Sequence, residues 1–219
     1  MVAYLSLGLN CQPIMSAIKD RLVPDREGGR LTSVFDLCWT TSEALCHFIE
    51  TEFTDFFDDI ALIGNPRRDF RTPTGELLYS FVLNAAYGDL IVNAKYGMIF
   101  NHESPGHPTL ANTENWGSPQ RFCRNNFHEF RARYARRIET FLSTIDSCIK
   151  NDAELIFLLI ANSEDREIIA NSLARKYPEL KFRIQFSEFL DIDKIIYSDI
   201  RDYFFGSPSE ASLRKAANE

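Results

Sequence analysis

The sequence lacks any apolar run long enough to cross a membrane, which takes about 18 to 20 residues in a helix. Its opening residues, MVAYLSLGLNCQP, have neither a basic segment nor a small-residue cleavage site after the short apolar stretch. The five cysteines include no CxxC pair, and their odd number and wide spacing do not suit a disulfide framework. We therefore expect a cytoplasmic protein with reduced thiols.

Positive charge is also in short supply, because 24 Lys and Arg stand against 31 Asp and Glu, for a net charge of −7. This balance argues against a nucleic-acid binder, which needs basic side chains to neutralise phosphates. The chain has no Walker motif and no G-x-G-x-x-G fingerprint, and its His and Cys spacings match no compact metal site. We expect no cofactor, no metal, no nucleic-acid partner and no membrane contact, and the oligomeric state stays open.

Large apolar side chains are abundant, since 45% of the residues are hydrophobic and there are 18 Phe and 8 Tyr. That is enough to fill a substantial core. An apolar strand at 3–8 precedes a helix, and a strand, helix and strand follow one another over 154–186. The sequence predicts a single α/β domain over 1–206, followed by a polar flexible tail at 207–219. We expect three layers, with a mostly parallel central sheet, covering helices and an antiparallel hairpin excursion.

Several boundaries follow from local patterns. Thr40 and Glu43 have the spacing of a capping box and predict a helix over 41–53, after an extended piece at 31–39. Ser118 and Pro119 are expected to open the longest helix, and Ser163 to cap a later one. The first helix is expected to bury one face, formed by Ile14, Met15, Ile18 and Leu22. Short strands in LLYSFVLN, DLIVN and YGMIFNH make up the antiparallel excursion.

Cys11 is the strongest candidate for chemistry. Pro13 fits the first turn of a helix, which puts Cys11 at or just before the helix N-terminus. The helix dipole and unsatisfied backbone N–H groups there favour the thiolate, and the turn Asn10–Gln12 offers donors for an oxyanion. The alternative is a small buried hydrophobe at a strand-to-helix turn.

A thiolate nucleophile needs an imidazole to move its proton and a carboxylate to orient the ring, and His102 and Asp36 are the candidates. His102 could instead be a structural histidine at a strand end, and Asp36 a turn former or helix cap. The remaining cysteines are interpreted as packing residues, namely Cys38, Cys46, Cys123 and Cys148.

Four arginines lie on one stretch of the longest predicted helix: Arg131, Arg133, Arg136 and Arg137. The simplest interpretation is a solvated face. Alternatively, Arg136 and Arg137 bind a carboxylate or phosphate of the substrate, because a planar guanidinium suits both anions.

Two segments, SLGLNCQPIMSAIK with SVFDLCW and KYGMIFNHE with ARYARRIETF, resemble a bacterial domain family of unknown function labelled papain-like cysteine peptidase. The resemblance covers roughly residues 4–186. The family pattern falls on these positions: Ser6, Gly8, Cys11, Phe35, Asp36, Tyr96, Gly97, Phe100, His102, Arg136 and Arg137. The chain departs from it in having Val34 in place of Pro, an aromatic shifted to Trp39, and Glu103 where the family has Asp after the histidine.

Two functions are compatible with these features. In the first, the chain is a thiol-dependent hydrolase or acyltransferase that acts on a small-molecule, peptide or other acyl substrate. Cys11, His102 and Asp36 are its catalytic residues, and Asn10, Gln12, Arg136 and Arg137 contact the substrate. In the second, it is a non-catalytic glycan- or ligand-binding α/β domain associated with polysaccharide biosynthesis, with the arginine-rich helix and the loop 103–118 as the contact surface.

Overall fold

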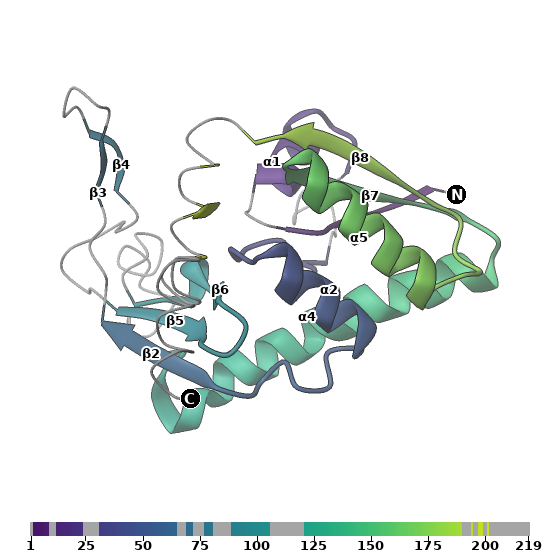
Figure 1. The fold of residues 1–219 in the computed structure, drawn as a ribbon. Helices are drawn as coiled ribbons and strands as arrows, with labels where there is room; N and C mark the ends of the chain where they lie inside the picture. The colour runs from purple at the N-terminus through teal and green to yellow at the C-terminus, as the bar shows by residue number, and fades with distance from the viewer. Residues whose placement is uncertain are drawn as a thin grey trace, which may run out of the picture.

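The computed structural model describes an α/β fold that has one parallel sheet and a smaller antiparallel one (Figure 1). The described residues are 2–8, 12–23, 31–64, 69–71, 77–80, 89–105, 121–189, 194, 197, 198 and 201. The predicted tail at 207–219 lies outside them. No helix in these ranges has both the length and the apolar composition required to cross a bilayer.

The parallel sheet has the strand order β1 (Val2–Ser6), β7 (Glu154–Ala161), β8 (Phe182–Glu188). Strand β7 is central and almost wholly buried, as expected for a continuous apolar run. It reaches β8 through α5 (Ser163–Lys176), so the strand, helix and strand predicted over 154–186 are confirmed.

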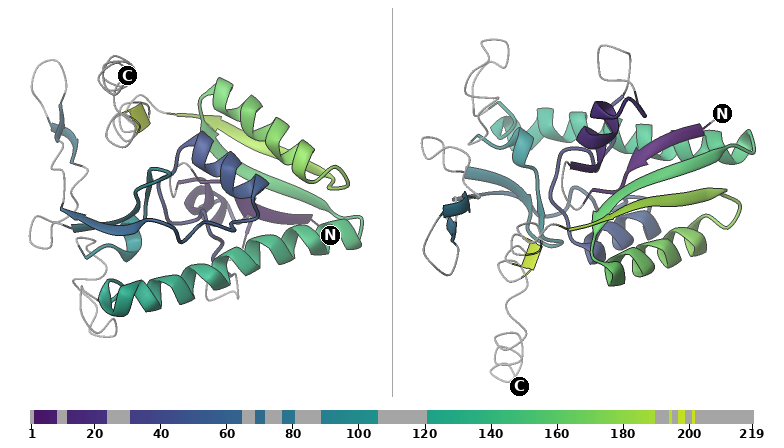
Figure 2. Two further views of the ribbon diagram at one scale, coloured as in Figure 1. Left: turned by 60° about the horizontal axis from the view of Figure 1, so that its bottom comes forward. Right: turned by 90° about the horizontal axis from the view of Figure 1, so that it is seen from above.

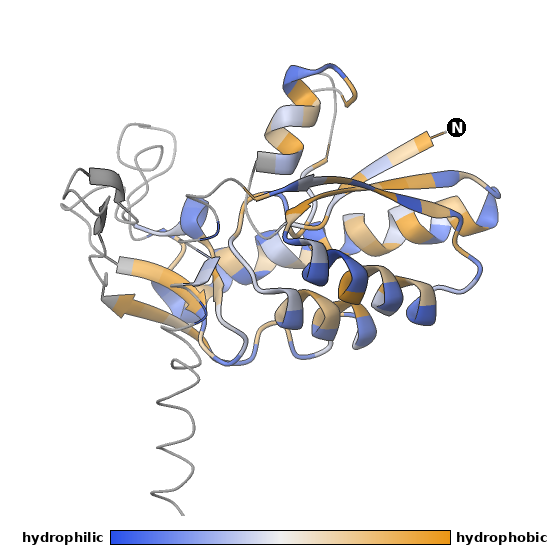
Figure 3. Ribbon diagram, turned by 45° about the horizontal axis from the view of Figure 1, so that its top comes forward, coloured by the Kyte–Doolittle hydropathy of each residue, from blue (hydrophilic) through white to orange (hydrophobic). Residues whose placement is uncertain are grey.

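Helices cover both faces of this sheet, and the side chains of β7 alternate between them. Ile156 and Leu158 pack with Ile14 and Ala17 of α1 (Gln12–Lys19). Phe157 and its alternate neighbours face α4 (Arg124–Lys150) and α5 on the other side. Figures 2 and 3 show this layering, with hydrophobic residues gathered on the strands. The predicted three-layer α/β class is confirmed.

The antiparallel sheet has β5 (Asp89–Asn93) between β2 (Ile60–Gly64) and β6 (Met98–Ile99). A separate hairpin of β3 (Asp69–Arg71) and β4 (Leu77–Ser80) projects from the body in Figure 1. The expected excursion therefore exists, but β4 pairs with β3 and not with β5, and sequence reasoning missed β2. Strand β2 is short, it follows the acidic residues Asp58 and Asp59, and its sequence shows no clear alternation of apolar and polar residues.

Helix α4 runs beneath both sheets and joins them in one core (Figure 2). It begins at Arg124 after a turn at 121–123, and the predicted start at Ser118 lies outside the described residues. Asn125, Asn126 and Phe127 have left-handed backbone angles, and the regular helix follows them. Its buried stripe is formed by Phe130, Tyr134, Arg137, Phe141, Ile145 and Cys148. An arginine thus occupies the centre of an apolar stripe.

Helix α2 (Ser42–Glu50) packs on α5, and the observed N-cap of each helix lies one residue from the predicted cap. Thr41, not Thr40, accepts from the backbone N–H of Ala44 at 3.2 Å. Asn162, not Ser163, caps α5 by accepting from Asp165 N–H at 2.8 Å.

Two further local predictions are partly wrong. Ile14 is buried and Ile18 packs beside it, as predicted, but Ala17 completes the buried face, while Met15 and Leu22 are 55% and 41% exposed. Residues 34–37 form a turn and not an extended piece, because Asp36 binds back to the backbone of Ser33, and a bridge from Trp39 to Ile99 of β6 follows.

Candidate active site

The C-terminal end of β1 leads directly to the predicted nucleophile. Gly8 follows the strand with a φ of +74°, and a methyl group at this position would lie 3.1 Å from the Cβ and the carbonyl oxygen of Phe35. Only glycine tolerates both the left-handed backbone and this close approach. Helix α1 begins at Gln12, while Asn10 and Cys11 lie outside the described residues. The active-site role of Cys11 stays a prediction.

Asp36 belongs to the turn that Gly8 packs against. It is 1% exposed, and its Oδ2 accepts from the backbone N–H of Ser33 at 2.7 Å, while its own N–H donates to the Ser33 carbonyl at 3.3 Å. These bonds give Asp36 the turn-forming role considered for it. The carboxylate also interacts electrostatically with Arg137 of α4.

His102 lies in η1 (Asn101–Glu103), a 3-10 turn directly after β6, and it is half-buried. This turn is held to the antiparallel sheet by Ser104, whose hydroxyl accepts from Ile91 N–H at 2.9 Å and donates to the Phe100 carbonyl at 2.8 Å. The expected strand end is therefore a strand followed by a tightly anchored turn, which fixes the position of His102.

Three segments that are distant in the sequence meet at this end of the fold. Gly8 contacts Phe35, which is the residue before Asp36. Trp39 and Ile99 exchange two backbone hydrogen bonds of 2.9 Å, three residues before His102. The segments that carry Asp36 and His102 thus adjoin each other, and the first of them adjoins the chain entering the Cys11 turn.

Glu103 is a buried residue of the candidate site to which the sequence motifs assigned no role. It is fully buried, and its Oε1 accepts from Arg137 Nη2 at 2.8 Å and from Arg133 Nη1 at 3.2 Å. Its Oε2 accepts from the Tyr134 hydroxyl at 3.1 Å. Interpreting these arginines as a solvated face is wrong for Arg137, which is 5% exposed. The available signal was the pair of arginines four residues apart, which share one helix face.

The electrostatics of this cluster follow from its burial. Burial disfavours the charged form of Arg137, but the carboxylates of Glu103 and Asp36 oppose it, and the pKa of the guanidinium is raised. Burial lowers the pKa of Arg133, against the opposing effect of Glu103. Burial also raises the pKa of Tyr134 well above its ordinary value, so this phenol stays neutral. The arginines remain cationic at physiological pH because their ordinary pKa is so high.

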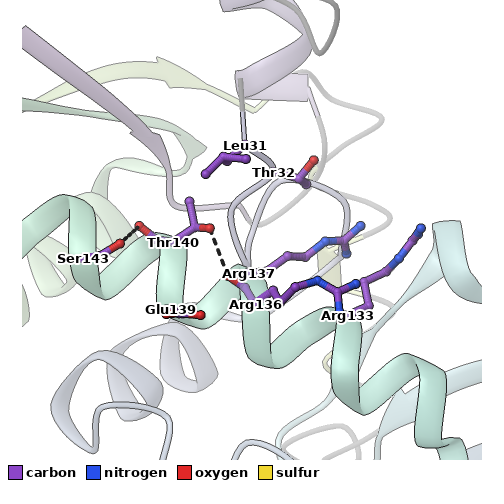
Figure 4. Close-up of a pocket in the computed structure, with 8 residues that line it drawn as sticks. All are labelled: Leu31, Thr32, Arg133, Arg136, Arg137, Glu139, Thr140 and Ser143. Atoms are coloured by element: carbon purple, nitrogen blue, oxygen red, sulfur yellow. Dashed lines mark hydrogen bonds between the residues drawn. The ribbon is translucent and has the colours of Figure 1, made fainter. Parts of the chain in front are cut away.

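The two predicted substrate-binding arginines line the same pocket, which has a volume of about 610 Å³ (Figure 4). Arg136 is exposed and Arg137 buried. The described residues that line it are Leu31, Thr32, Arg133, Arg136, Arg137, Glu139, Thr140 and Ser143. Leu31 and Thr140 also line a second pocket of about 330 Å³ that includes Asp36. The pocket of the arginines and the pocket of the candidate catalytic carboxylate thus share two lining residues.

A second polar cluster links α2 to the β5–β6 hairpin. His47 Nε2 lies 2.9 Å from Asp55 Oδ1, Lys95 Nζ lies 3.3 Å from Asp55 Oδ2, and the Tyr96 hydroxyl donates to the same carboxylate. Burial on its own would raise the pKa of Asp55, but the hydrogen bonds from Tyr96, His47 and Lys95 hold it at about 2. This arrangement neutralises a carboxylate and ties two elements together.

The cysteines other than Cys11 have the packing roles predicted for them. Cys38 and Cys148 are buried, Cys46 and Cys123 are half-buried, and none of these four forms a disulfide. Burial raises the pKa of the Cys46 thiol to about 11. Within the described ranges, no three His, Cys, Asp or Glu side chains are grouped so as to hold a metal ion.

Comparison with protein-family models, with curated proteins and with solved structures finds no match to this chain. The resemblance to the peptidase-like family therefore stays a prediction from the sequence motifs. Several motif residues have local structural roles. The Ser6 hydroxyl accepts from Gly8 N–H at 3.2 Å, and Tyr96 binds Asp55.

Proposed function

We propose that the chain is a thiol-dependent acyl-transfer enzyme in which Cys11 is the nucleophile, His102 carries the proton and Asp36 orients the imidazole. The observation that carries the proposal is that α1 begins at Gln12, immediately after Cys11, beyond the C-terminal end of β1. In α/β folds, ligands bind outside the carboxyl ends of parallel strands. A helix N-terminus also favours the thiolate.

The reaction would proceed in two steps, acylation of Cys11 and release of the acyl group. The Cys11 sulfur attacks the substrate carbonyl carbon, its proton passes to His102, and His102 protonates the departing amine or alcohol. In the second step, water or an amine attacks the carbonyl carbon of the resulting thioester and gives a proton to His102. The C–S bond then breaks, and His102 returns that proton to the Cys11 sulfur. Backbone N–H groups in the turn Asn10–Gln12 would stabilise the oxyanion in both steps.

The choice of Asp36 over Glu103 as the orienting carboxylate rests on hydrogen bonding. Both oxygens of Glu103 are already bound, by Arg133, Arg137 and Tyr134. Glu103 therefore acts as the anchor of the 3-10 turn on α4 and positions its neighbour His102. Asp36 lies on the segment that adjoins both the β1 end and β6, which supports the orienting role.

Alkylation by iodoacetamide across a range of pH tests the proposal, with each cysteine followed by peptide mass mapping. We expect a titration midpoint for Cys11 below the value of about 8.5 for an ordinary thiol, and a higher midpoint in His102→Ala. Cys46, with a pKa of about 11, is an internal reference for an unactivated thiol. An ordinary midpoint for Cys11 that His102→Ala does not move would contradict the proposal and favour a binding domain.

A further inference from the structure

The pocket beside α4 contains a buried cation whose hydrogen bonding is incomplete. Arg137 uses Nη2 to bind Glu103, but its buried Nη1 has no hydrogen-bond partner in the described structure. A buried guanidinium N–H without an acceptor is unfavourable, and such groups are rare in native proteins. The Arg137 side chain lines the pocket, so an acceptor on a ligand would complete it.

Arg136 adds a second cation at the open side of the same pocket. It is exposed, and its side chain forms no ion pair in the part of the chain that the structure describes. Glu103 and Asp36 hold Arg137 from the interior side. Glu139 is the one carboxylate among the described lining residues, and it too is exposed. The two guanidinium groups are thus placed to bind an anionic oxygen of a ligand.

The other polar groups that line the pocket are suited to accept hydrogen bonds from hydroxyl groups of a ligand. Thr140 donates its hydroxyl proton to the Arg136 carbonyl at 2.9 Å, and Ser143 donates to the Thr140 carbonyl at 3.3 Å (Figure 4). Their oxygens are therefore left as acceptors, as is the carboxylate of Glu139. A volume of about 610 Å³ is in the range of small-molecule sites and far exceeds the needs of a bare ion.

We propose that this pocket binds a phosphate ester rich in hydroxyl groups, such as a sugar phosphate. Arg136 and Arg137 hold the phosphate, with Arg137 Nη1 as one donor, and Thr140, Ser143 and Glu139 accept hydrogen bonds from the hydroxyls. The site does not depend on the proposed thiol chemistry, because Cys11 has no part in it.

Isothermal titration of the full chain at constant ionic strength tests this site, in a Cys11→Ser background that removes thiol chemistry. The ligands are glucose 6-phosphate, inorganic phosphate and malonate. We expect saturable binding of both phosphates, tighter for glucose 6-phosphate, and weaker binding of malonate. Arg136→Gln should weaken phosphate binding about tenfold or more, since a charged hydrogen bond is lost. Arg124→Gln, an equal charge change on an exposed residue of the same helix, should leave it unaltered.

Three outcomes would overturn the assignment. The first is an absence of saturable binding by either phosphate at millimolar concentration. The second is an equal loss in Arg136→Gln and Arg124→Gln, which would indicate general charge attraction. The third is tighter binding of malonate than of either phosphate, which would make the ligand a carboxylate.

Discussion

Arg137 Nη2 lies 2.8 Å from Glu103 Oε1, and both side chains are shut off from solvent in the middle of the α4 packing face. The pair joins the long helix to the turn that carries His102. Burying two charges is expensive, and it is tolerated here because Arg133 and Tyr134 supply further hydrogen bonds to the carboxylate. The ion pair therefore fixes where η1 sits.

Replacing Glu103 by Gln should destabilise the protein by about 3–5 kcal/mol, because it leaves the buried charge of Arg137 uncompensated. The free energy of unfolding from urea titrations, with an unchanged m value, measures this effect. Glu139→Gln makes the same change at an exposed site of α4 and should stay within about 0.5 kcal/mol of wild type. An equal loss of unfolding free energy in the two variants would show that the buried pair of Glu103 and Arg137 contributes no more to stability than an exposed carboxylate.

Gly8→Ala should destabilise the protein and also disturb Cys11. The new methyl group would meet Phe35 at 3.1 Å, on a backbone with a φ of +74°, and we expect a loss of about 1–3 kcal/mol. Gly97→Ala is the matched control, since its φ of +68° creates similar strain on the β5–β6 hairpin. Urea unfolding measures stability, and iodoacetamide labelling reports on the thiol. Only Gly8→Ala should change the labelling rate of Cys11, and an equal change in Gly97→Ala would contradict the proximity inferred here.

Asp55 should give the protein an acid-sensitive stability. Its folded pKa of about 2 lies below the ordinary 3.8, so unfolding takes up a proton in this window. The stabilisation is complete above pH 3.8 and is lost as the pH falls through about 2. We expect on the order of 1 kcal/mol, after allowing for solvent screening of a partly exposed carboxylate. Asp55→Asn should abolish this pH dependence in urea titrations, and Asp58→Asn, at an exposed neighbour, should retain it.

The periodic and apolar parts of this fold could be predicted from the sequence, and its long-range polar pairs could not. The continuous run of β7 and the aromatic stripe from Phe130 to Phe141 carry their own signals in spacing. No such spacing signal marks Glu103, because its burial depends on Arg137, which lies 34 positions further along the chain. The cap at Thr41 was misplaced by one residue for a related reason, since adjacent threonines offer the same hydroxyl and only the chain path chooses between them.

The site was predictable to a similar extent. The motif placed His102 at the end of a strand, which fits the structure as local geometry. Asp36 was expected within an extended piece, and it lies instead in a turn, which is the alternative considered for it. A solvated face is the simplest interpretation of Arg137, because an arginine at helical spacing is usually exposed. Its partner Glu103 lies in the 3-10 turn η1, far away in the sequence, and no local pattern encodes that contact.

Asp165 should have the opposite pH behaviour to Asp55. Burial raises the pKa of Asp165 above its ordinary 3.8, although the Ser42 hydroxyl donates to Oδ1; Oδ2 has no hydrogen-bond partner within the described ranges. The native state therefore holds this proton more tightly than the unfolded state. The corresponding stability is fully present below pH 3.8 and is lost as the pH rises through the folded pKa.

Asp165→Asn keeps an acceptor for Ser42 and removes the titration. Relative to wild type, the variant should be more stable at about pH 7 than at about pH 4, because only wild type must ionise a buried carboxyl between them. Urea unfolding at the two pH values measures the difference. Glu164→Gln, at the exposed preceding position of α5, should change both values by the same small amount. If the difference in unfolding free energy between wild type and Asp165→Asn is the same at about pH 4 and about pH 7, then Asp165 titrates as an ordinary solvated carboxyl.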